Sequence, residues 1–435
     1  MSKLPDRATV PSRRLPSRQG WRAAALALPA AGALALPVAC ARSGGRGPSP
    51  GIPDGGAATA AAGWVEPVAP GVVHRRLAIP RGPWVVHVLD VALDSCWTFA
   101  ARKAGGQAVG RLGTRALAGE LAAGGQTVAG AVNADFFTFR PPGTTENVHV
   151  ERGDLVLGPS DRPVFAVRSD GRPWIGHLGV RGRAVLGADT VALTAWNRGP
   201  SRGPAAAAAP GAESGVALFD ARYGARTDSA PGRLFVRLAP VPRPDARPLV
   251  GAVLDVDSGA AAVLPAGGYV LAVGPSAPAA LRARLARLRP GVDTARLEVA
   301  LVADGAATAP RAAVGGWPVL VRDGRVEPAL DTVGPAGFRS RNPRSAVALV
   351  GARRALLVAL DGRRPGYSAG ATLPEFAELL RALGATDALN LDGGGSTTLV
   401  VAGPAGAALR IVNRPSDEAG ERPVANALAV VRGCR

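Results

Sequence analysis

Histidine and cysteine are scarce in this sequence, and their scarcity limits the metal chemistry open to the protein. The 435 residues include four histidines and three cysteines. Three cysteines are too few for a metal site built from cysteine alone, and the histidines lack the spacing of metal ligands. We therefore expect no metal cofactor. A divalent cation held by oxygen atoms, such as calcium, is the alternative that this composition leaves open.

Aromatic residues and lysine are also rare. Aromatic side chains make up 4% of the chain, so stacking platforms for nucleic-acid bases are scarce. The formal net charge is +18, but lysine occurs only at Lys3 and Lys103, and the arginines are spread along the chain. This pattern argues against nucleic-acid binding and leaves a general attraction to acidic polymers open.

Residues 1–41 have the pattern of a secretory signal. Arginines between positions 13 and 22 precede an apolar run of mostly small residues over 23–41. Cleavage after Ala41 and lipidation of Cys40 both fit the sequence, so we expect an exported protein that is periplasmic, anchored to the cell envelope or secreted. No later run is long and apolar enough to span a bilayer, so a lipid on Cys40 would be its membrane contact.

The rest of the chain is predicted to form one domain after a linker. Residues 42–63 are rich in Gly, Pro, Ser and Ala, which is typical of a flexible linker. Residues 64–435 form the domain, with an alanine-rich, low-complexity loop at 198–214. Within it, Cys96 and Cys434 could pair in an oxidising compartment.

Short strands prevail in the first two thirds of this domain, and the final third differs. Helices are expected at 114–123, 278–288 and 372–384. In the final third, strands are expected at 355–361, 388–392 and 424–431. A strand–helix–strand order makes the two strands of 355–392 parallel. The predicted fold class is therefore α+β, with mixed β-sheets and a C-terminal βαβ unit that carries an Asp-Gly-Gly-Gly-Ser signature.

That signature is the most informative stretch of the chain. A short apolar strand reaches Asn390 and Asp392, and Gly393, Gly394 and Gly395 follow, then the hydroxyls of residues 396–398. Glycines at this density allow backbone to approach a ligand closely or point N–H groups at an anion.

Asp361 ends the other strand of the predicted βαβ unit. Parallel strands end on the same edge of a sheet, where open α/β sheets bind ligands, so Asp361 and Asp392 are expected to lie near each other. The alternative is that each aspartate only forms a turn.

Ordered motifs across residues 70–432 resemble the phosphodiester glycosidase family. The matching segments are 131–137, 146–148, 163–171, 341–348, 357–399, 415–417 and 422–430. Three positions depart from the family pattern, because Asp135, Ser345 and Ala348 stand where Gly, Thr and Gly are usual. The resemblance implies hydrolysis of a sugar-1-phosphodiester at the C1–O bond, which frees the sugar and leaves a phosphomonoester.

This reaction requires carboxylates for an oxocarbenium-like transition state and positive charge for the phosphodiester. The candidate catalytic residues are Asp392, Asp361 and Glu146. Arg344 is the candidate residue for binding the phosphate. The alternative role for Arg344 is a structural ion pair. The other candidate substrate-binding residues offer amide groups, backbone N–H groups or hydroxyls; they are Asn133, Asn390, Gly393, Gly394, Gly395, Ser396 and Thr397.

Two other functions remain open at this point. One is a non-catalytic, glycan-binding lipoprotein of the cell envelope on the same scaffold. The other is a phosphodiesterase that cuts the P–O bond with a divalent ion held by Asp361 and Asp392. The expected partner in each case is a carbohydrate or glycan phosphodiester.

Overall fold

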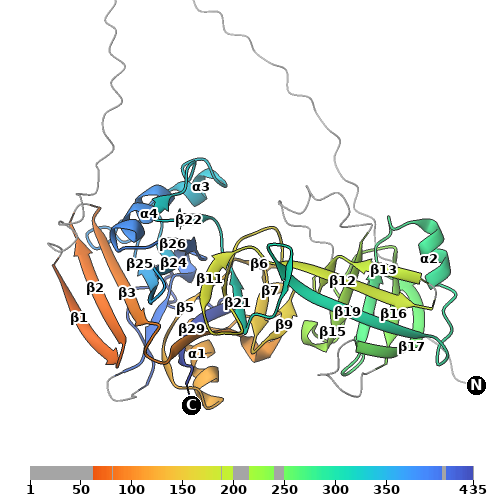
Figure 1. Ribbon diagram of the computed structural model, residues 1–435. Helices are drawn as coiled ribbons and strands as arrows, with labels where there is room; N and C mark the ends of the chain where they lie inside the picture. The colour runs from red at the N-terminus through yellow and green to blue at the C-terminus, as the bar shows by residue number, and fades with distance from the viewer. Residues whose placement is uncertain are drawn as a thin grey trace, which may run out of the picture. The chain divides into compact units, whose positions relative to one another are not determined.

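The computed structural model of the protein describes residues 62–80, 82–187, 189–198, 215–239, 249–403 and 408–434 (Figure 1). The predicted signal, Cys40, the predicted linker up to residue 61 and all of the predicted alanine-rich loop except Arg198 lie outside these residues. Within the described part, no helix is long and apolar enough to cross a membrane.

The fold is mostly β, with 48% strand and 12% helix, so the predicted α+β class is wrong. An eight-stranded sheet contains the predicted βαβ segment. Its strands, in spatial order, are β1 (Ala62–Ala69), β2 (Val72–Ile79), β3 (Trp84–Ala92), β25 (Arg354–Leu360), β24 (Arg344–Val350), β26 (Asp387–Asn390), β22 (Val319–Arg322) and β23 (Arg325–Val326).

The two strands of the predicted βαβ unit are not neighbours. β24 lies between β25 and β26 and pairs with both in antiparallel fashion. β25 also pairs antiparallel with β3 on its other side. β25 and β26 run in the same direction, but they belong to an antiparallel sheet, which corrects the predicted C-terminal βαβ unit.

Burial on both faces explains why β25 reads like a strand of a parallel sheet. Leu357 and Ala359 face one hydrophobic core, and Val358 and Leu360 face another. A strand buried on both faces is a continuous apolar run whichever way its neighbours point. The helix α4 (Leu373–Ala382) covers the second face, and it begins with the predicted capping box.

A five-stranded sheet packs against the other face of the eight-stranded sheet. Its strands are β28 (Arg410–Ile411), β27 (Leu399–Val401), β5 (Val128–Asn133), β29 (Asn426–Arg432) and β4 (Trp97–Lys103). The core between the two sheets includes Leu89, Leu357 and Leu428. The helix α1 (Thr114–Ala123), which has the predicted bounds, covers the outer face of the five-stranded sheet through Ala118 and Leu121.

A second five-stranded sheet and a hairpin follow along the chain. The sheet contains β11 (Pro173–Gly176), β10 (Val164–Val167), β21 (Ala312–Gly315), β8 (His149–Glu151) and β9 (Asp154–Leu157). The hairpin joins β6 (Phe137–Phe139) to β7 (Pro142–Thr145). A short helix, α3 (Ala336–Arg339), precedes β24.

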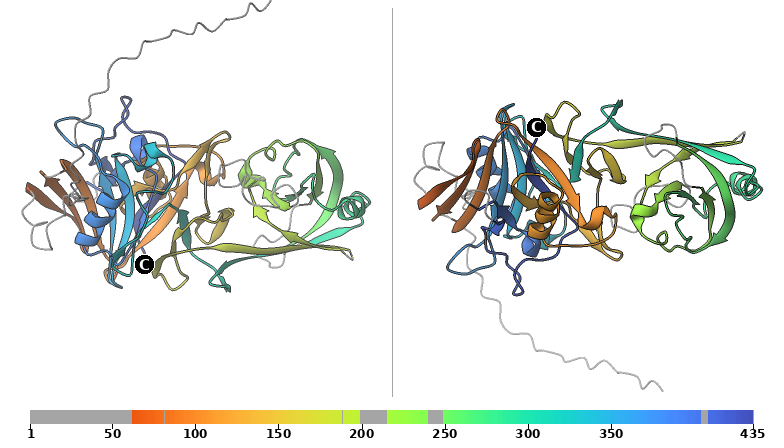
Figure 2. Two further views of the ribbon diagram at one scale, coloured as in Figure 1. Left: turned by 90° about the horizontal axis from the view of Figure 1, so that it is seen from above. Right: turned by 90° about the horizontal axis from the view of Figure 1, so that it is seen from below.

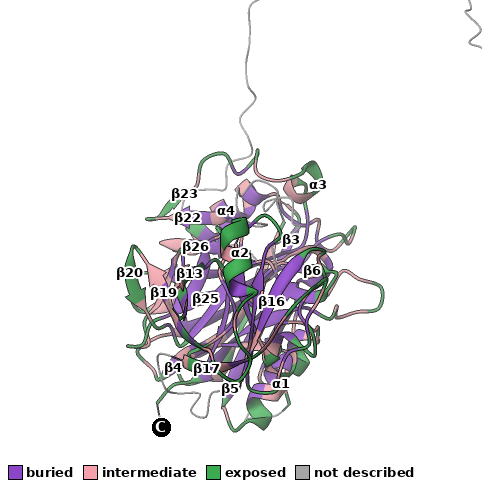
Figure 3. Cartoon of the chain, turned by 90° about the vertical axis from the view of Figure 1, so that its right-hand side faces the viewer, coloured by how far each residue is buried: buried purple, intermediate pink, exposed green. Residues whose placement is uncertain are grey.

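A nine-stranded sheet curves into a nearly closed barrel (Figure 2). Its strands are β13 (Asp189–Leu193), β12 (Gly179–Leu186), β19 (Thr294–Ala303), β17 (Leu249–Gly259), β16 (Arg233–Leu238), β18 (Tyr269–Val273), β15 (Val216–Asp220) and β14 (Ala195–Trp196), with β20 (Ala306–Thr308) paired to β19. Figure 3 shows β16 largely buried, β20 exposed and α2 (Ala279–Leu285) largely exposed, with Leu285 as the buried residue of α2.

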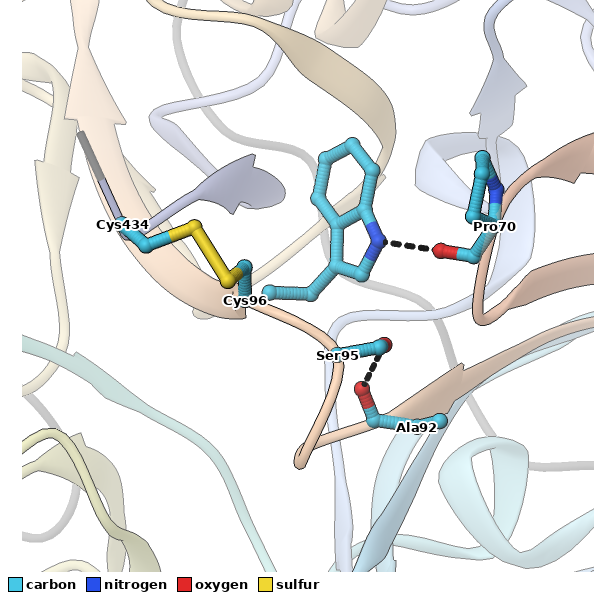
Figure 4. Close-up of a disulfide and its surroundings, with 6 residues drawn as sticks. Pro70, Ala92, Ser95, Cys96 and Cys434 are labelled. Atoms are coloured by element: carbon cyan, nitrogen blue, oxygen red, sulfur yellow. Dashed lines mark hydrogen bonds between the residues drawn. A yellow bond between two sulfur atoms is a disulfide. The ribbon is translucent and has the colours of Figure 1, made fainter.

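A disulfide joins Cys96 to Cys434 near the end of the chain (Figure 4). β4 and β29 pair in antiparallel register, with Trp97 opposite Arg432, so the residues that flank the pair already lie together. The Trp97 indole donates a hydrogen bond to the Pro70 carbonyl at 2.8 Å, which fixes the start of β4 against the β1–β2 turn.

Reduction of this disulfide should lower the free energy of unfolding by about 2–5 kcal/mol, because the link closes a long loop in the unfolded chain. Denaturant unfolding with and without reductant measures the change. The double variant Cys96→Ser, Cys434→Ser is the control, and its stability should not respond to reductant. Equal stability of the oxidised and reduced wild type would contradict the prediction.

Candidate active site

The two aspartates predicted to share one edge have very different surroundings. β25 and β26 end at the same edge of the eight-stranded sheet, and Asp361 and Asp392 follow them. Asp361 is fully buried. Its carboxylate accepts hydrogen bonds from the Tyr367 hydroxyl at 3.0 Å, the Asn413 side-chain amide at 3.1 Å and the Arg414 N–H at 3.0 Å. Burial raises the pKa of Asp361. Through the last two of these hydrogen bonds, the Asp361 carboxylate holds residues 413–414 in place.

Asp392 is partly exposed, and burial of its carboxylate raises its pKa to about 6. The Ser396 hydroxyl, the Arg422 charge and the Gly393 N–H oppose this shift, and the charge of Glu146 adds to it. A carboxyl group with a pKa near 6 can exchange a proton close to neutral pH. Asp392 is therefore the predicted carboxylate best suited to acid–base chemistry.

Asn133 fixes the backbone on which Asp392 is carried. Its side-chain amide donates to the Asp392 carbonyl at 2.6 Å, and its oxygen accepts from the Ser345 hydroxyl at 2.7 Å and the Thr398 N–H at 3.1 Å. The residue is fully buried. Asn133 is a candidate substrate-binding residue by sequence, but this geometry fits orientation of the Asp392 segment rather than contact with a sugar.

Asn390 holds the other side of the same segment. Its amide donates to the Trp317 carbonyl at 2.7 Å, and the Trp317 N–H donates back to its carbonyl at 2.8 Å. The Asn390 Oδ1 and the Thr397 Oγ1 are buried and have no hydrogen-bond partner among the described residues. Such atoms favour a ligand or ordered water at this place.

Close contacts explain the last two of the three consecutive glycines. A Cβ on Gly395 would lie 2.1 Å from the Asp417 Oδ1 and 2.2 Å from the Arg422 Nη2. Gly394 has a φ of 61°, and a Cβ there would lie 3.0 Å from the Arg363 Nη2. The loop therefore lets two arginine side chains approach the backbone beside Asp392.

Arg344 does not have the exposed position expected of a phosphate clamp. It is 2% exposed, and it donates to the carbonyls of Ala371 at 2.9 Å and of Phe338 and Ser340 at 2.8 Å. Burial and the charge of Arg363 lower its pKa to about 10. Arg344 thus holds the α3 segment through backbone carbonyls.

Arg363 and Arg422 are the cations at the glycine loop, and sequence reasoning did not single them out. Arg363 is exposed and donates to the Asn342 side-chain oxygen at 2.7 Å, while Arg422 pairs with Asp417 at 2.7 Å. The sequence did contain a signal for both arginines. Arg363 follows the candidate Asp361 by two residues, and Arg422 stands in the last segment that matches the family.

Glu146 comes to this group from the segment between β7 and β8. It forms an ion pair with Arg162 at 2.5 Å, and its side chain is 34% exposed. The Arg162 guanidinium lies 5.2 Å from the Trp317 ring centre and 5.7 Å from that of Phe136. The charge of Glu146 contributes to the raised pKa of Asp392.

A cavity of about 530 Å³ lies elsewhere, with Asp161, His177 and Asp304 in its lining. None of the predicted site residues lines it. Among the described residues, no group of three or more His, Cys, Asp and Glu side chains could hold a metal ion.

A β scaffold with carboxylates and arginines around a glycine loop is chemically suited to hydrolysis of a charged substrate. Residues 250–431 match the model of the phosphodiester glycosidase family. The match confirms the resemblance indicated by the motifs and identifies this segment as a phosphodiester glycosidase domain. It contains Asp361, the glycine loop and both new arginines, whereas Glu146 and Asn133 precede it. No curated protein matches the chain.

Solved structures share the fold. A hypothetical protein from Synechocystis has a TM-score of 0.67 and 22% identity, covering 85% of this chain and 64% of the other. A protein of Burkholderia pseudomallei described as exported has a TM-score of 0.62 and 24% identity, covering 80% of this chain and 74% of the other. The catalytic domain of zebrafish N-acetylglucosamine-1-phosphodiester alpha-N-acetylglucosaminidase, auto-inhibited by its pro-peptide, has 14% identity over 85% of this chain and 82% of that domain. Its TM-score of 0.41 does not define a shared fold.

Buried histidines lie behind Asp361. The His74 Nε2 and His87 Nδ1 share a hydrogen bond of 3.1 Å, and the His87 Nε2 lies 3.9 Å from the Asp361 carboxylate. Burial lowers the pKa of His74 to about 4, and burial together with the His74 charge lowers that of His87 to about 3. Both side chains are therefore neutral at neutral pH.

Acid should destabilise the protein through this pair. Folding lowers both pKa values below the ordinary 6.5, so the folded state binds fewer protons and stability falls as pH drops from about 6.5 toward 4. Each unit of pKa difference costs up to about 1.4 kcal/mol. Urea unfolding between pH 7 and 4 should show a smaller acid loss for His87→Gln. The exposed His177→Gln is the control and should keep the wild-type pH dependence, whereas an unchanged dependence in His87→Gln would contradict the assignment.

Proposed function

We propose that the protein hydrolyses the glycosidic C1–O bond of a sugar-1-phosphodiester, releasing the sugar and leaving a phosphomonoester. One observation carries the proposal: Asp392, with its pKa raised to about 6, lies within the electrostatic influence of Glu146 and beside a glycine loop flanked by Arg363 and Arg422. The family match of residues 250–431 supports phosphodiester glycosidase chemistry.

The carboxylates and arginines would divide the work of the reaction. Asp392 exchanges a proton with water or with the leaving oxygen, since its pKa lies near the working range. Glu146, open to solvent on one side, stabilises positive charge at the anomeric carbon. Arg363 and Arg422 bind the phosphodiester and stabilise the charge that develops on the leaving phosphate. A phosphate leaves without strong acid assistance, so the arginines carry much of this step.

The protein would encounter its substrate outside the cytoplasm. The N-terminal signal pattern and the Cys96–Cys434 disulfide both support export to an oxidising compartment. A glycan phosphodiester of the cell envelope is the substrate class that fits this location and the charges at the loop.

Hydrolysis in ¹⁸O-labelled water should place the label in the released sugar. Cleavage of C1–O adds the water oxygen to the anomeric carbon, whereas P–O cleavage would add it to the phosphate. Mass spectrometry of both products locates the label. Label in the phosphate, with turnover abolished by chelator, would establish the metal-assisted phosphodiesterase instead. Saturable glycan binding without turnover across a panel of sugar-1-phosphodiesters would establish the binding protein.

Asp392→Asn should lower kcat by about 10²-fold or more, because the amide cannot exchange the proton. Thermal unfolding should remain near wild type, since the Asp392 backbone keeps its hydrogen bonds to Ala134 and Asn133. Asp170→Asn, at an exposed turn, is the matched control and should retain full activity. Wild-type kcat in Asp392→Asn would remove Asp392 from the reaction.

A further inference from the structure

Asp135 is a buried carboxylate directly beside the proposed site, and the proposed reaction does not use it. It lies between β5 and β6 and is 1% exposed. Its N–H donates to the Asn426 side-chain oxygen at 2.9 Å. Its Oδ2 accepts from the Asn147 N–H at 2.8 Å, and its Oδ1 has no hydrogen-bond partner among the described residues.

The space for this carboxylate depends on a glycine of β21. A Cβ on Gly315 would lie 2.5 Å from the Asp135 Oδ2 and 2.4 Å from the Asn147 Cβ. The absence of a side chain at Gly315 therefore allows Asp135 and Asn147 to meet. The contact joins the chain after β5 to the chain before β8.

Asn147 carries this contact into the site. Its side-chain amide donates to the carbonyls of Arg162 at 2.7 Å and Pro163 at 3.0 Å, and its side-chain oxygen accepts from the Ser160 N–H at 2.8 Å. It also directly follows Glu146 in the chain. The backbones of both members of the Glu146–Arg162 ion pair are thus tied to Asn147.

We propose that Asp135 is a positioning residue that holds Asn147 and thereby keeps Glu146 and Arg162 in place at the proposed site. The expected effect on catalysis rests on the proposed function. The positioning of Asn147 rests on the hydrogen bonds described above. Asp135 itself does not touch the reacting atoms. It acts through the Asn147 N–H, whose position sets that of the preceding Glu146.

The charge of Asp135 also affects this pair. The ionisable groups that act on it are Lys103, Glu146, Arg162 and Arg198. Burial, with a contribution from the Glu146 charge, raises the pKa of Asp135 to about 7, and burial lowers that of Lys103 to about 7. Above pH 7 the ionised Asp135 repels Glu146 and competes for Arg162, so activity should decline there.

The test compares two substitutions at Asp135 with a matched one elsewhere. Asp135→Ala removes the acceptor for the Asn147 N–H, and Asp135→Asn retains an acceptor oxygen but never ionises. Asp90→Asn is the control, because Asp90 is 5% exposed and pairs with Arg354 in the eight-stranded sheet without contact to the site. All three variants lose a buried carboxylate, so Asp90→Asn shows what the loss of such a group does away from the site.

Asp135→Ala should lower kcat about 10- to 100-fold with a smaller change in KM, because small displacements of a reacting group cost rate. Asp135→Asn should retain kcat within about threefold at pH 6, since a positioning hydrogen bond needs only the acceptor oxygen. Its kcat profile should lose the decline above pH 7. Asp90→Asn should show wild-type kcat, KM and pH profile. Wild-type kinetics in Asp135→Ala would overturn the proposal.

Hydrogen exchange separates this proposal from the proposed function. In the full chain, Asp135→Ala should exchange faster over residues 145–148 and 160–163, whereas Asp90→Asn should not. Faster exchange in a protein without turnover on any sugar-1-phosphodiester would refute the function and support the positioning role. Unchanged exchange in Asp135→Ala would refute the positioning role whatever the activity.

Discussion

The buried amide of Asn133 is the interaction on which the candidate site depends. Its hydrogen bonds connect the end of β5 to Ser345 in β24, to the Asp392 carbonyl and to the Thr398 N–H. Asn133 and its partners together come from both packed sheets and from the loop between β26 and β27. The amide has no exposure to solvent, so its donor and acceptor must be satisfied inside the protein. A side chain without both groups would leave the partners unsatisfied and the Asp392 loop unattached.

The glycine loop follows from the same geometry. Once Asp392 is fixed between two sheets, the chain must turn to begin β27, and the Asp417–Arg422 pair and Arg363 already lie against it. Side chains at 394 and 395 would meet these groups, so glycine is required by contact as well as by the positive φ of Gly394. The result is backbone that approaches guanidinium groups closely, which is a suitable arrangement for an anionic substrate.

Local signals in the sequence predicted local structure well. The helix at 114–123 and the capped start of α4 were confirmed, because helix periodicity and capping depend on neighbouring residues. The position of β24 between β25 and β26 was not predictable, since a strand buried on both faces gives no sign of its neighbours' direction. The motifs also indicated Asp392 and Glu146, but they could not show that Arg344 bonds to backbone carbonyls while Arg363 lies at the loop.

Burial and hydrogen-bond donors separate the roles of four carboxylates that look alike in sequence. Asp361 accepts from side-chain and backbone donors and has no exposure, so its charge is used to hold structure. Among the described residues, Asp135 has one donor and an oxygen without a hydrogen-bond partner, and burial favours its neutral form at and below neutral pH. Asp392 and Glu146 retain access to solvent, and chemistry on a substrate requires that access. The difference lies in the donors that the fold brings to each group, and these come from residues far away in the sequence.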